Sequence, residues 1–150
     1  MGDTTDKQLI CIVDDEPTNV ELLRFMLADD YDVCVAYSGE EALATILTSK
    51  PNLILLDIVM PDMSGYEVFK ILRNNPTTSS IPVIFVTGLE DKASETEGLE
   101  LGAVDYVVKP VVGDIVKARI ERILQTDLYI EYLERSLADR EEQLVSKAVK

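Results

Sequence analysis

The chain has 150 residues, of which 47% are hydrophobic and 28% charged, a length and composition typical of one globular domain with a short appendage. Its 14 basic and 28 acidic residues give a formal net charge of −14, which disfavours direct binding to nucleic acid. The chain contains no histidine, which excludes histidine-dependent triads, zinc–histidine sites and phosphohistidine carriers within it.

The N-terminal residues and the cysteines indicate the compartment. The first residues, MGDTTDKQ, are polar and acidic and lack the apolar segment of a secretory signal, and residues 1–6 are expected to be a disordered lead. No apolar run approaches the length of about 18 residues that a membrane span needs. Cys11 and Cys34 stand in apolar runs without CxxC spacing, as buried thiols do in a reducing compartment. These features predict a soluble, cytoplasmic protein without a membrane partner.

Five short runs rich in valine, isoleucine and leucine are predicted to be strands. Most of them are continuously apolar rather than alternating, which is typical of strands in a parallel sheet with helices on both faces. The runs are Leu9–Val13, Asp32–Ala36, Leu53–Leu56, Val83–Val86 and Asp105–Val108.

Segments with helical periodicity lie between these strands. Their apolar faces are Val20, Leu23 and Leu27; Ala42, Leu43, Ile46 and Leu47; and Val68, Ile71 and Leu72. The stretch 91–101 has few apolar anchors and contains Gly98, so it suits either a solvated surface helix or a marginally stable element that moves. The alternation of strands and helices predicts an α/β fold with a doubly wound, five-stranded parallel sheet.

From about Asp114 onward the chain has one helical pattern without proline or glycine. Apolar residues recur every seven positions, at Val116, Ile123, Ile130, Leu137 and Leu144. Three positions later the companion series reads Arg119, Thr126, Leu133 and Arg140. Only one residue of that second series is apolar, so the pattern is half of a coiled coil.

The first part of this extended C-terminal helix is predicted to pack on the sheet through Ile115, Ile120 and Leu124. The helix is then predicted to leave the body near Leu124 and to continue to at least Leu137. Where the helix leaves the body near Leu124, the sheet no longer covers its apolar stripe. The stripe consists of Ile123, Ile130, Leu133, Leu137 and Leu144. A lone helix is marginal in water, so we expect the extension, residues 126–150, to pair with the same helix of a second subunit. A frayed helical tail is the alternative.

Polar residues follow four of the five predicted strands. Asp14-Asp15-Glu16 follows the first strand, Asp57 the third, Thr87 the fourth and Lys109-Pro110 the fifth. In an open α/β sheet, ligands bind at the carboxyl ends of the strands, so these side chains are expected at one edge. Converging carboxylates bind Mg²⁺, and one carboxylate can then act as a nucleophile toward phosphorus. A hydroxyl and an ammonium group suit contacts to phosphoryl oxygens.

Each of these residues has an ordinary explanation when it is taken alone. Acidic residues such as Asp14 and Asp15 are favoured at the start of a helix, and Asp57 suits a turn after a strand. Lys109 taken alone is an ordinary surface lysine. Their joint occurrence at the ends of four strands favours the phosphate-directed site.

The segments IVDDEPTN, LILLDIVMPDMSG, VIFVTG and GAVDYVVKP resemble the motifs of receiver (response-regulator) domains of two-component signal transduction. The resemblance covers residues 7–125 and implies a flavodoxin-like sheet of strand order 2-1-3-4-5. It implies that Asp57 is the phosphoacceptor. It also implies that Mg²⁺ is bound by Asp57, by Asp15 directly, by Asp14 mainly through water, and by the backbone carbonyl of Val59.

The same resemblance implies a switch. Thr87 corresponds to the hydroxyl that follows the phosphoryl group, Tyr106 to the switch aromatic, and Lys109 to the ammonium group of the site. The bond from Lys109 to Pro110 is expected to be cis. Phosphorylation by a histidine kinase or phosphotransfer protein is then expected to change the face formed by the fourth helix, the fifth strand and the last helix, together with the C-terminal helix. A homodimer through that face or through the C-terminal helix is expected.

The output of such a switch stays open between two classes. The chain could be a module of a longer regulator, joined to an output domain such as a cyclic-dinucleotide enzyme, or a stand-alone regulator that binds a partner protein. The uninterrupted helix favours the first class, and no output domain is visible in the sequence. A phosphatase of the aspartyl-phosphate type would need a second carboxylate two residues after the nucleophile, where this chain has Val59. We therefore expect no enzyme activity beyond phosphorylation and dephosphorylation of its own aspartate.

Overall fold

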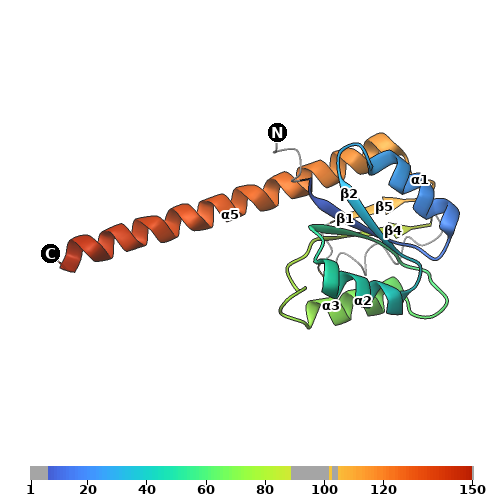
Figure 1. Cartoon of the computed structure of the whole chain (residues 1–150), viewed down its shortest axis with the longest axis horizontal. Coiled ribbons are helices and arrows are strands. Elements are labelled where there is room, and N and C mark those ends of the chain that lie inside the picture. Colours follow the sequence, from blue (N-terminus) through green and yellow to red (C-terminus); the bar gives the residue numbers. More distant parts are fainter. Residues whose placement is uncertain (1–6, 89–101, 103–104, 150) are drawn as a thin grey trace.

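The computed structural model describes residues 7–88, 102 and 105–149, and it contains one parallel sheet (Figure 1). The strands lie in the order β2-β1-β3-β4-β5, which confirms the predicted doubly wound sheet and its strand order. Their bounds are β1 (Leu9–Val13), β2 (Asp32–Ala36), β3 (Leu53–Asp57), β4 (Val83–Thr87) and β5 (Asp105–Val108). Within the described residues, no helix is both long and apolar enough to cross a membrane.

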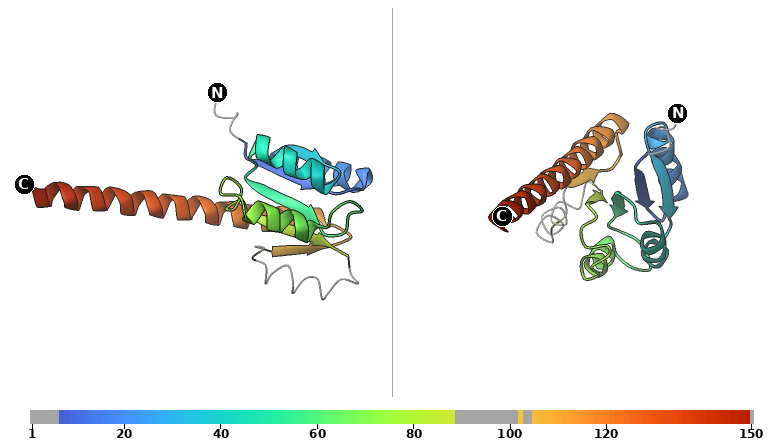
Figure 2. Two further views of the ribbon diagram at one scale, coloured as in Figure 1. Left: turned by 90° about the horizontal axis from the view of Figure 1, so that it is seen from below. Right: turned by 60° about the vertical axis from the view of Figure 1, so that its left-hand side comes forward.

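Helices cover both faces of the sheet (Figure 2). Their bounds are α1 (Pro17–Leu27), α2 (Gly39–Ser49), α3 (Gly65–Arg73) and α5 (Gly113–Val149). One apolar cluster joins the sheet to α2 and α3, and a second joins it to α1 and α5. The helix predicted at 91–101 and the disordered lead predicted at 1–6 lie outside the described residues.

The continuous apolar runs are explained by burial of both sides of each central strand. In β3, Ile54 and Leu56 contribute to the cluster under α2 and α3, whereas Leu53 and Leu55 contribute to the cluster under α1 and α5. Successive side chains of a strand point to opposite faces, so a strand covered on both faces needs apolar residues at every position. The first charged position of β3 is its last residue, Asp57.

The predicted faces of α2 and α3 are only partly correct. Leu47 and Ile71 are exposed, although both were expected in apolar faces. In α3 the buried residues are Gly65, Val68, Phe69 and Leu72, whose spacing of three and four places them on one side of the helix. Ile71 lies beside that face, and the larger Phe69 fills the core instead.

The long helix α5 is continuous from Gly113 to Val149, which confirms the predicted helix. It contacts the body through side chains that are at most 4% exposed, namely Val116, Ile120, Ile123 and Leu124. The predicted contact of Ile115 is wrong, because this side chain is 49% exposed beside the packed face. Ile123 was assigned to the stripe without a sheet to cover, but it belongs to the core. Leu124 is the last residue of α5 in this core cluster, and the C-terminal part of the helix projects from the body (Figure 1).

The two cysteines are neighbours on adjacent strands. Cys11 of β1 pairs in register with Cys34 of β2, and both are free thiols. Cys11 is buried and Cys34 is partly buried against the same apolar cluster. The expectation of buried thiols is therefore confirmed for Cys11 and only in part for Cys34.

Candidate functional site

Four polar side chains come from the carboxyl ends of four adjacent strands. Asp14 directly follows β1, Asp57 ends β3, Thr87 ends β4 and Lys109 directly follows β5. The register pairs Asp57 with Val86, so Thr87 lies one residue further along the neighbouring strand. The parallel sheet thus brings the polar ends to one edge, as the sequence predicted.

Lys109 connects the two buried carboxylates at this edge. Its Nζ lies 3.3 Å from Oδ1 of Asp57 and 3.6 Å from Oδ2 of Asp14. Burial disfavours the charged form of Lys109, but Asp57 and Asp14 outweigh burial and raise its pKa above the ordinary value. The Lys109 backbone N–H donates to the Thr87 carbonyl over 2.7 Å, and the bond from Lys109 to Pro110 is cis, as expected.

The fold holds the Asp57 carboxyl group in an environment that disfavours its ionised form. Asp57 is 3% exposed. Burial and then the nearby charge of Asp14 raise the pKa of Asp57 to about 6, although Lys109 and the backbone N–H of Val59 oppose this shift by favouring the ionised form. At neutral pH the side chain is therefore an ionised, poorly solvated carboxylate whose negative charge is only partly offset. Such a group can act as a nucleophile or bind a cation.

Three acidic residues after β1 form a cluster of oxygen ligands. One carboxylate oxygen from each of Asp14, Asp15 and Glu16 lies within 4.8 Å of the others. Oδ1 of Asp14 also accepts a hydrogen bond of 2.9 Å from the backbone N–H of Glu16, which fixes the turn into α1. Hard oxygen ligands of this kind suit Mg²⁺. Glu16 belonged to the predicted acidic run, but its sequence position gave no reason to assign it to the metal.

The loop from β3 to α3 is held by hydrogen bonds at two places. The backbone N–H of Gly65 donates to the Ile58 carbonyl over 2.8 Å, and a Cβ at Gly65 would clash with the carbonyl oxygen of Asp57. The carboxylate of Asp62 accepts hydrogen bonds of 3.2 Å from the backbone N–H groups of Gly39 and Glu40, which lower the pKa of Asp62. The loop that contains Val59 is therefore anchored to the start of α2.

Neither anchor of this loop was assigned from the sequence. A glycine at the start of a helix and an aspartate after a proline are ordinary turn signals. Only the approach of Gly65 to the Asp57 backbone shows that a side chain is excluded there. The exposed Asp62 has no local signal, because its partners Gly39 and Glu40 lie more than twenty residues earlier in the sequence.

The two predicted switch residues lie on β4 and β5. Thr87 is 1% exposed, and its hydroxyl donates to the Gly88 carbonyl over 3.3 Å. Tyr106 is partly buried against the cluster under α2 and α3, and it pairs in register with Phe85 two residues before Thr87. Both side chains therefore belong to neighbouring strands behind the acidic edge.

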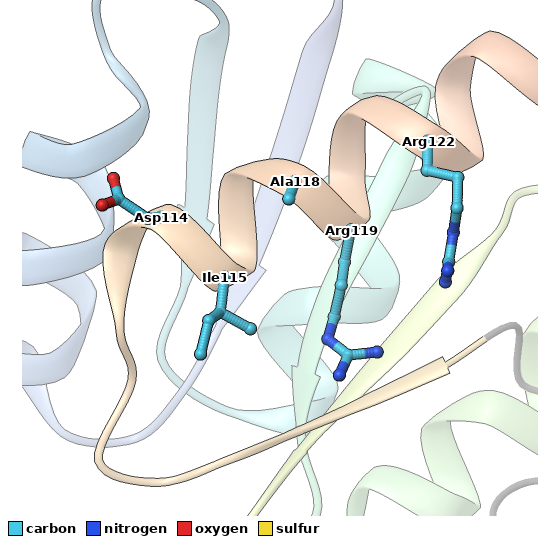
Figure 3. Close-up of a pocket in the computed structure, with 5 residues that line it drawn as sticks. All are labelled: Asp114, Ile115, Ala118, Arg119 and Arg122. Atoms are coloured by element: carbon cyan, nitrogen blue, oxygen red, sulfur yellow. The ribbon is translucent and has the colours of Figure 1, made fainter.

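A pocket lies along the first turns of α5. Asp114, Ile115, Ala118, Arg119 and Arg122 line it, and both arginines extend toward β5 (Figure 3). Oδ2 of Asp105, the first residue of β5, accepts hydrogen bonds of 2.6 Å from Arg119 and 3.0 Å from Arg122. These ion pairs connect α5 to the strand that also contains Tyr106.

The sequence has clear relatives. Residues 10–121 match the response regulator receiver domain family. A probable cyclic di-GMP phosphodiesterase of Vibrio cholerae is 44% identical over 142 residues, which are 90% of this chain and 32% of that protein. The response regulator PleD of Caulobacter vibrioides is 39% identical over 125 residues, which are 83% of this chain and 28% of that protein. The chain thus spans about a third of the length of these two relatives.

Solved structures show the same fold. A response regulator from Desulfuromonas acetoxidans aligns with a TM-score of 0.73 and 31% identity, covering 79% of this chain and 98% of that one. The chemotaxis protein CheY4 of Vibrio cholerae aligns with a TM-score of 0.73 and 27% identity, covering 77% of this chain and 98% of that one. The family match, the strand order and these relatives show that the chain belongs to the response regulator receiver domain family of two-component signalling.

Proposed function

We propose that this chain is a phosphorylation-activated receiver that accepts a phosphoryl group on Asp57 from a histidine kinase or a histidine phosphotransfer protein. The observation that carries the proposal is the contact of Lys109 with both Asp57 and Asp14 at the carboxyl edge of the sheet. An ammonium group in this position leaves the Asp57 oxygen ionised at neutral pH and is ready to contact the oxygens of an incoming phosphoryl group.

The transfer uses few protein groups. An oxygen of Asp57 forms a bond to phosphorus while the phosphorus–nitrogen bond of the donor's phosphohistidine breaks, and the leaving imidazole keeps the electron pair of that bond. Lys109 holds one of the phosphoryl oxygens, and the hydroxyl of Thr87 turns toward another. Their main contribution is positioning and charge stabilisation, because the group in transfer carries several negative charges.

The acidic cluster fits a magnesium ion. Asp15 and Asp57 would hold the ion directly, the backbone carbonyl of Val59 would complete the protein ligands, and Asp14 would act mainly through water. Bound Mg²⁺ would offset the negative charge of the phosphoryl oxygens. The oxygen-only donors of Asp14, Asp15 and Glu16 support this choice of ion.

The switch follows from one change of charge. A phosphorylated Asp57 attracts the hydroxyl of Thr87, and Tyr106 then moves into the space that Thr87 leaves. Tyr106 shares β5 with Asp105, whose ion pairs with Arg119 and Arg122 connect the strand to α5. We therefore expect a change at the acidic edge to alter the face formed by β5, α5 and the helix predicted at 91–101, and to extend along the C-terminal helix.

We further propose the organisation of the whole regulator. Residues 7–125 form the receiver domain and residues 126–150 a helical extension that resembles a coiled coil and supports a homodimer. The 44% identity to a much longer probable cyclic di-GMP phosphodiesterase favours an output domain that acts on a cyclic dinucleotide. A stand-alone regulator that controls a partner protein is the second candidate.

The Asp57→Asn variant tests the site directly. We expect the wild-type chain to be labelled by acetyl phosphate or phosphoramidate with Mg²⁺ and to bind beryllofluoride, and we expect the variant to do neither. The matched control is Asp29→Asn, which removes an exposed carboxylate between α1 and β2 and leaves the residues of the acidic edge and its loops unchanged. Normal labelling of the Asp57 variant would refute the assignment.

A further inference from the structure

Among the apolar side chains that the projecting half of α5 exposes, four form a stripe. Ile130, Leu133, Leu137 and Leu144 are all at least 41% exposed, and their spacing places them along one side of the helix. Within the described residues, the body covers α5 only as far as Leu124. The stripe is therefore an apolar surface without an intramolecular partner among those residues.

The two flanks of this stripe differ in charge. On one flank, three acidic residues recur at intervals of seven, namely Asp127, Glu134 and Glu141. The corresponding positions of the other flank are uncharged, namely Tyr129, Ser136 and Gln143. The asymmetry is not balanced by Arg135, because this residue pairs with Glu131 over 3.6 Å on the opposite side of the helix.

This asymmetry distinguishes the two ways of pairing two copies. In an antiparallel pair, flanks of the same kind face each other, so the three carboxylates of one copy would face those of the other. In a parallel pair, the acidic flank of each copy faces the uncharged flank of the other, where hydroxyl and amide groups can donate hydrogen bonds. Like charges at short range weaken association, so the charge pattern favours the parallel arrangement.

We propose that residues 127–145 form a parallel coiled coil with the same segment of a second copy, related by a two-fold axis along the stripe. The inference rests on the dimer of the proposed function and adds its orientation and its register. A closed two-fold pair of parallel helices has no stagger, because each residue must face its own copy. Both receiver bodies then lie at the same end of the coil.

Arg140 supplies a specific contact in this arrangement. It lies on the stripe between Leu137 and Leu144, where a leucine would give the stronger contact. In a parallel pair, a residue at this position packs beside the following flank residue of the other helix, so Arg140 meets Glu141 of the second copy. The two-fold axis forms this ion pair twice. In an antiparallel pair centred near Leu137, Arg140 would instead face Glu134 of the other copy, so only the parallel pair makes Arg140 and Glu141 partners.

A charge exchange tests the contact. The Arg140→Glu and Glu141→Arg variants each place like charges together in a parallel pair, so each is expected to weaken dimerisation by about tenfold. The variant with both changes is expected to restore the wild-type dissociation constant, measured by sedimentation equilibrium. Neighbouring residues do not face each other within one helix, so the helix itself is little affected by the exchange. Failure of the double variant to recover would overturn the proposed contact.

Cross-linking tests the orientation separately. A Leu144→Cys variant is expected to form a disulfide with its own copy under mild oxidation, whereas Glu142→Cys, which points away from the stripe, is expected to remain monomeric on a non-reducing gel. A mixture of Ile130→Cys and Leu144→Cys chains that cross-links only between the two variants would show an antiparallel pair and overturn the proposal. A wild-type chain that stays monomeric at a protein concentration of about 100 μM, with and without beryllofluoride, would instead refute the dimer on which the proposal rests.

Discussion

The acidic edge of the sheet and the projecting half of α5 both depart from the usual rule that charged side chains are exposed and apolar side chains are buried. The edge buries Asp14 and Asp57, whereas the helix exposes Leu137 and Leu144. Charges are rarely buried without compensation, and contiguous apolar surface is rarely left in water. The comparison teaches that each region has the character of an incomplete site, and our proposals complete the edge with a phosphoryl group and its cation and the helix with the same segment of a second copy.

The largest effect is expected where the edge is most tightly packed. Gly65→Ala places a Cβ against the Asp57 carbonyl oxygen, and both groups belong to backbone that cannot move freely. We expect the free energy of unfolding to fall by about 3 kcal/mol in urea titration. The control is Gly113→Ala, whose added Cβ meets only the flexible side chain of Met26. Equal stability of the two variants would contradict the tight packing of the edge.

Neutralising the buried charge of Asp57 should raise the free energy of unfolding, whereas Gly65→Ala lowers it. Asp57 has a pKa of about 6 in the folded chain and 3.8 as its ordinary value, so ionisation disfavours folding. The stability of the wild-type chain is therefore expected to fall as pH rises from about 4 to about 6. Above that range and without Mg²⁺, Asp57→Asn should raise the free energy of unfolding by about 3 kcal/mol, because the variant carries no such charge.

Magnesium sharpens this second prediction. If the proposed site is correct, the ion binds the folded wild type more tightly than the variant or the unfolded chain, so its addition should stabilise the wild type and reduce its difference from the variant. The measurement is a pair of thermal unfolding curves for each protein at pH 4 and pH 7.5, with and without Mg²⁺. A variant less stable than the wild type at pH 7.5 without Mg²⁺ would refute the raised pKa as the cause.

The smallest effect on the body is expected from removing the extension. A chain that ends at Gln125 retains Val116, Ile120, Ile123 and Leu124, which are the α5 side chains packed on the sheet. We expect its free energy of unfolding to stay within about 0.5 kcal/mol of the full chain at concentrations where both are monomeric. Its dimerisation should be lost in sedimentation experiments. A strongly destabilised body would show that the extension supports the receiver fold itself.

The strands and the acidic edge could be predicted because their signals are local. Apolar runs mark strands buried on both faces, and the predicted ends of β3 and β4 differ from the structure by one residue, Asp57 and Thr87. Since parallel strands share one carboxyl edge, the residues that follow them could be grouped without a structure.

The errors came from features that depend on packing between distant segments. Periodicity placed Ile115 and Ile71 in apolar faces, but the angle at which each helix meets the sheet decides which neighbour is buried. The bonds of Asp62 to Gly39 and Glu40 join segments far apart in the chain. The raised pKa of Asp57 depends on its burial and on the approach of Asp14, which no sequence pattern reports.

Because α5 is continuous, a small tilt of the helix at the receiver body becomes a large displacement at its far end. The helix runs without interruption from Gly113 to Val149, and the part beyond Leu124 is about 38 Å long at the rise of an ideal helix. A tilt of about 10° at the last packed turn would displace the far end by about 7 Å, which is more than the pitch of the helix. A small repacking beneath Val116 and Ile120 would thus become a large movement at the tip, without any change inside the projecting segment.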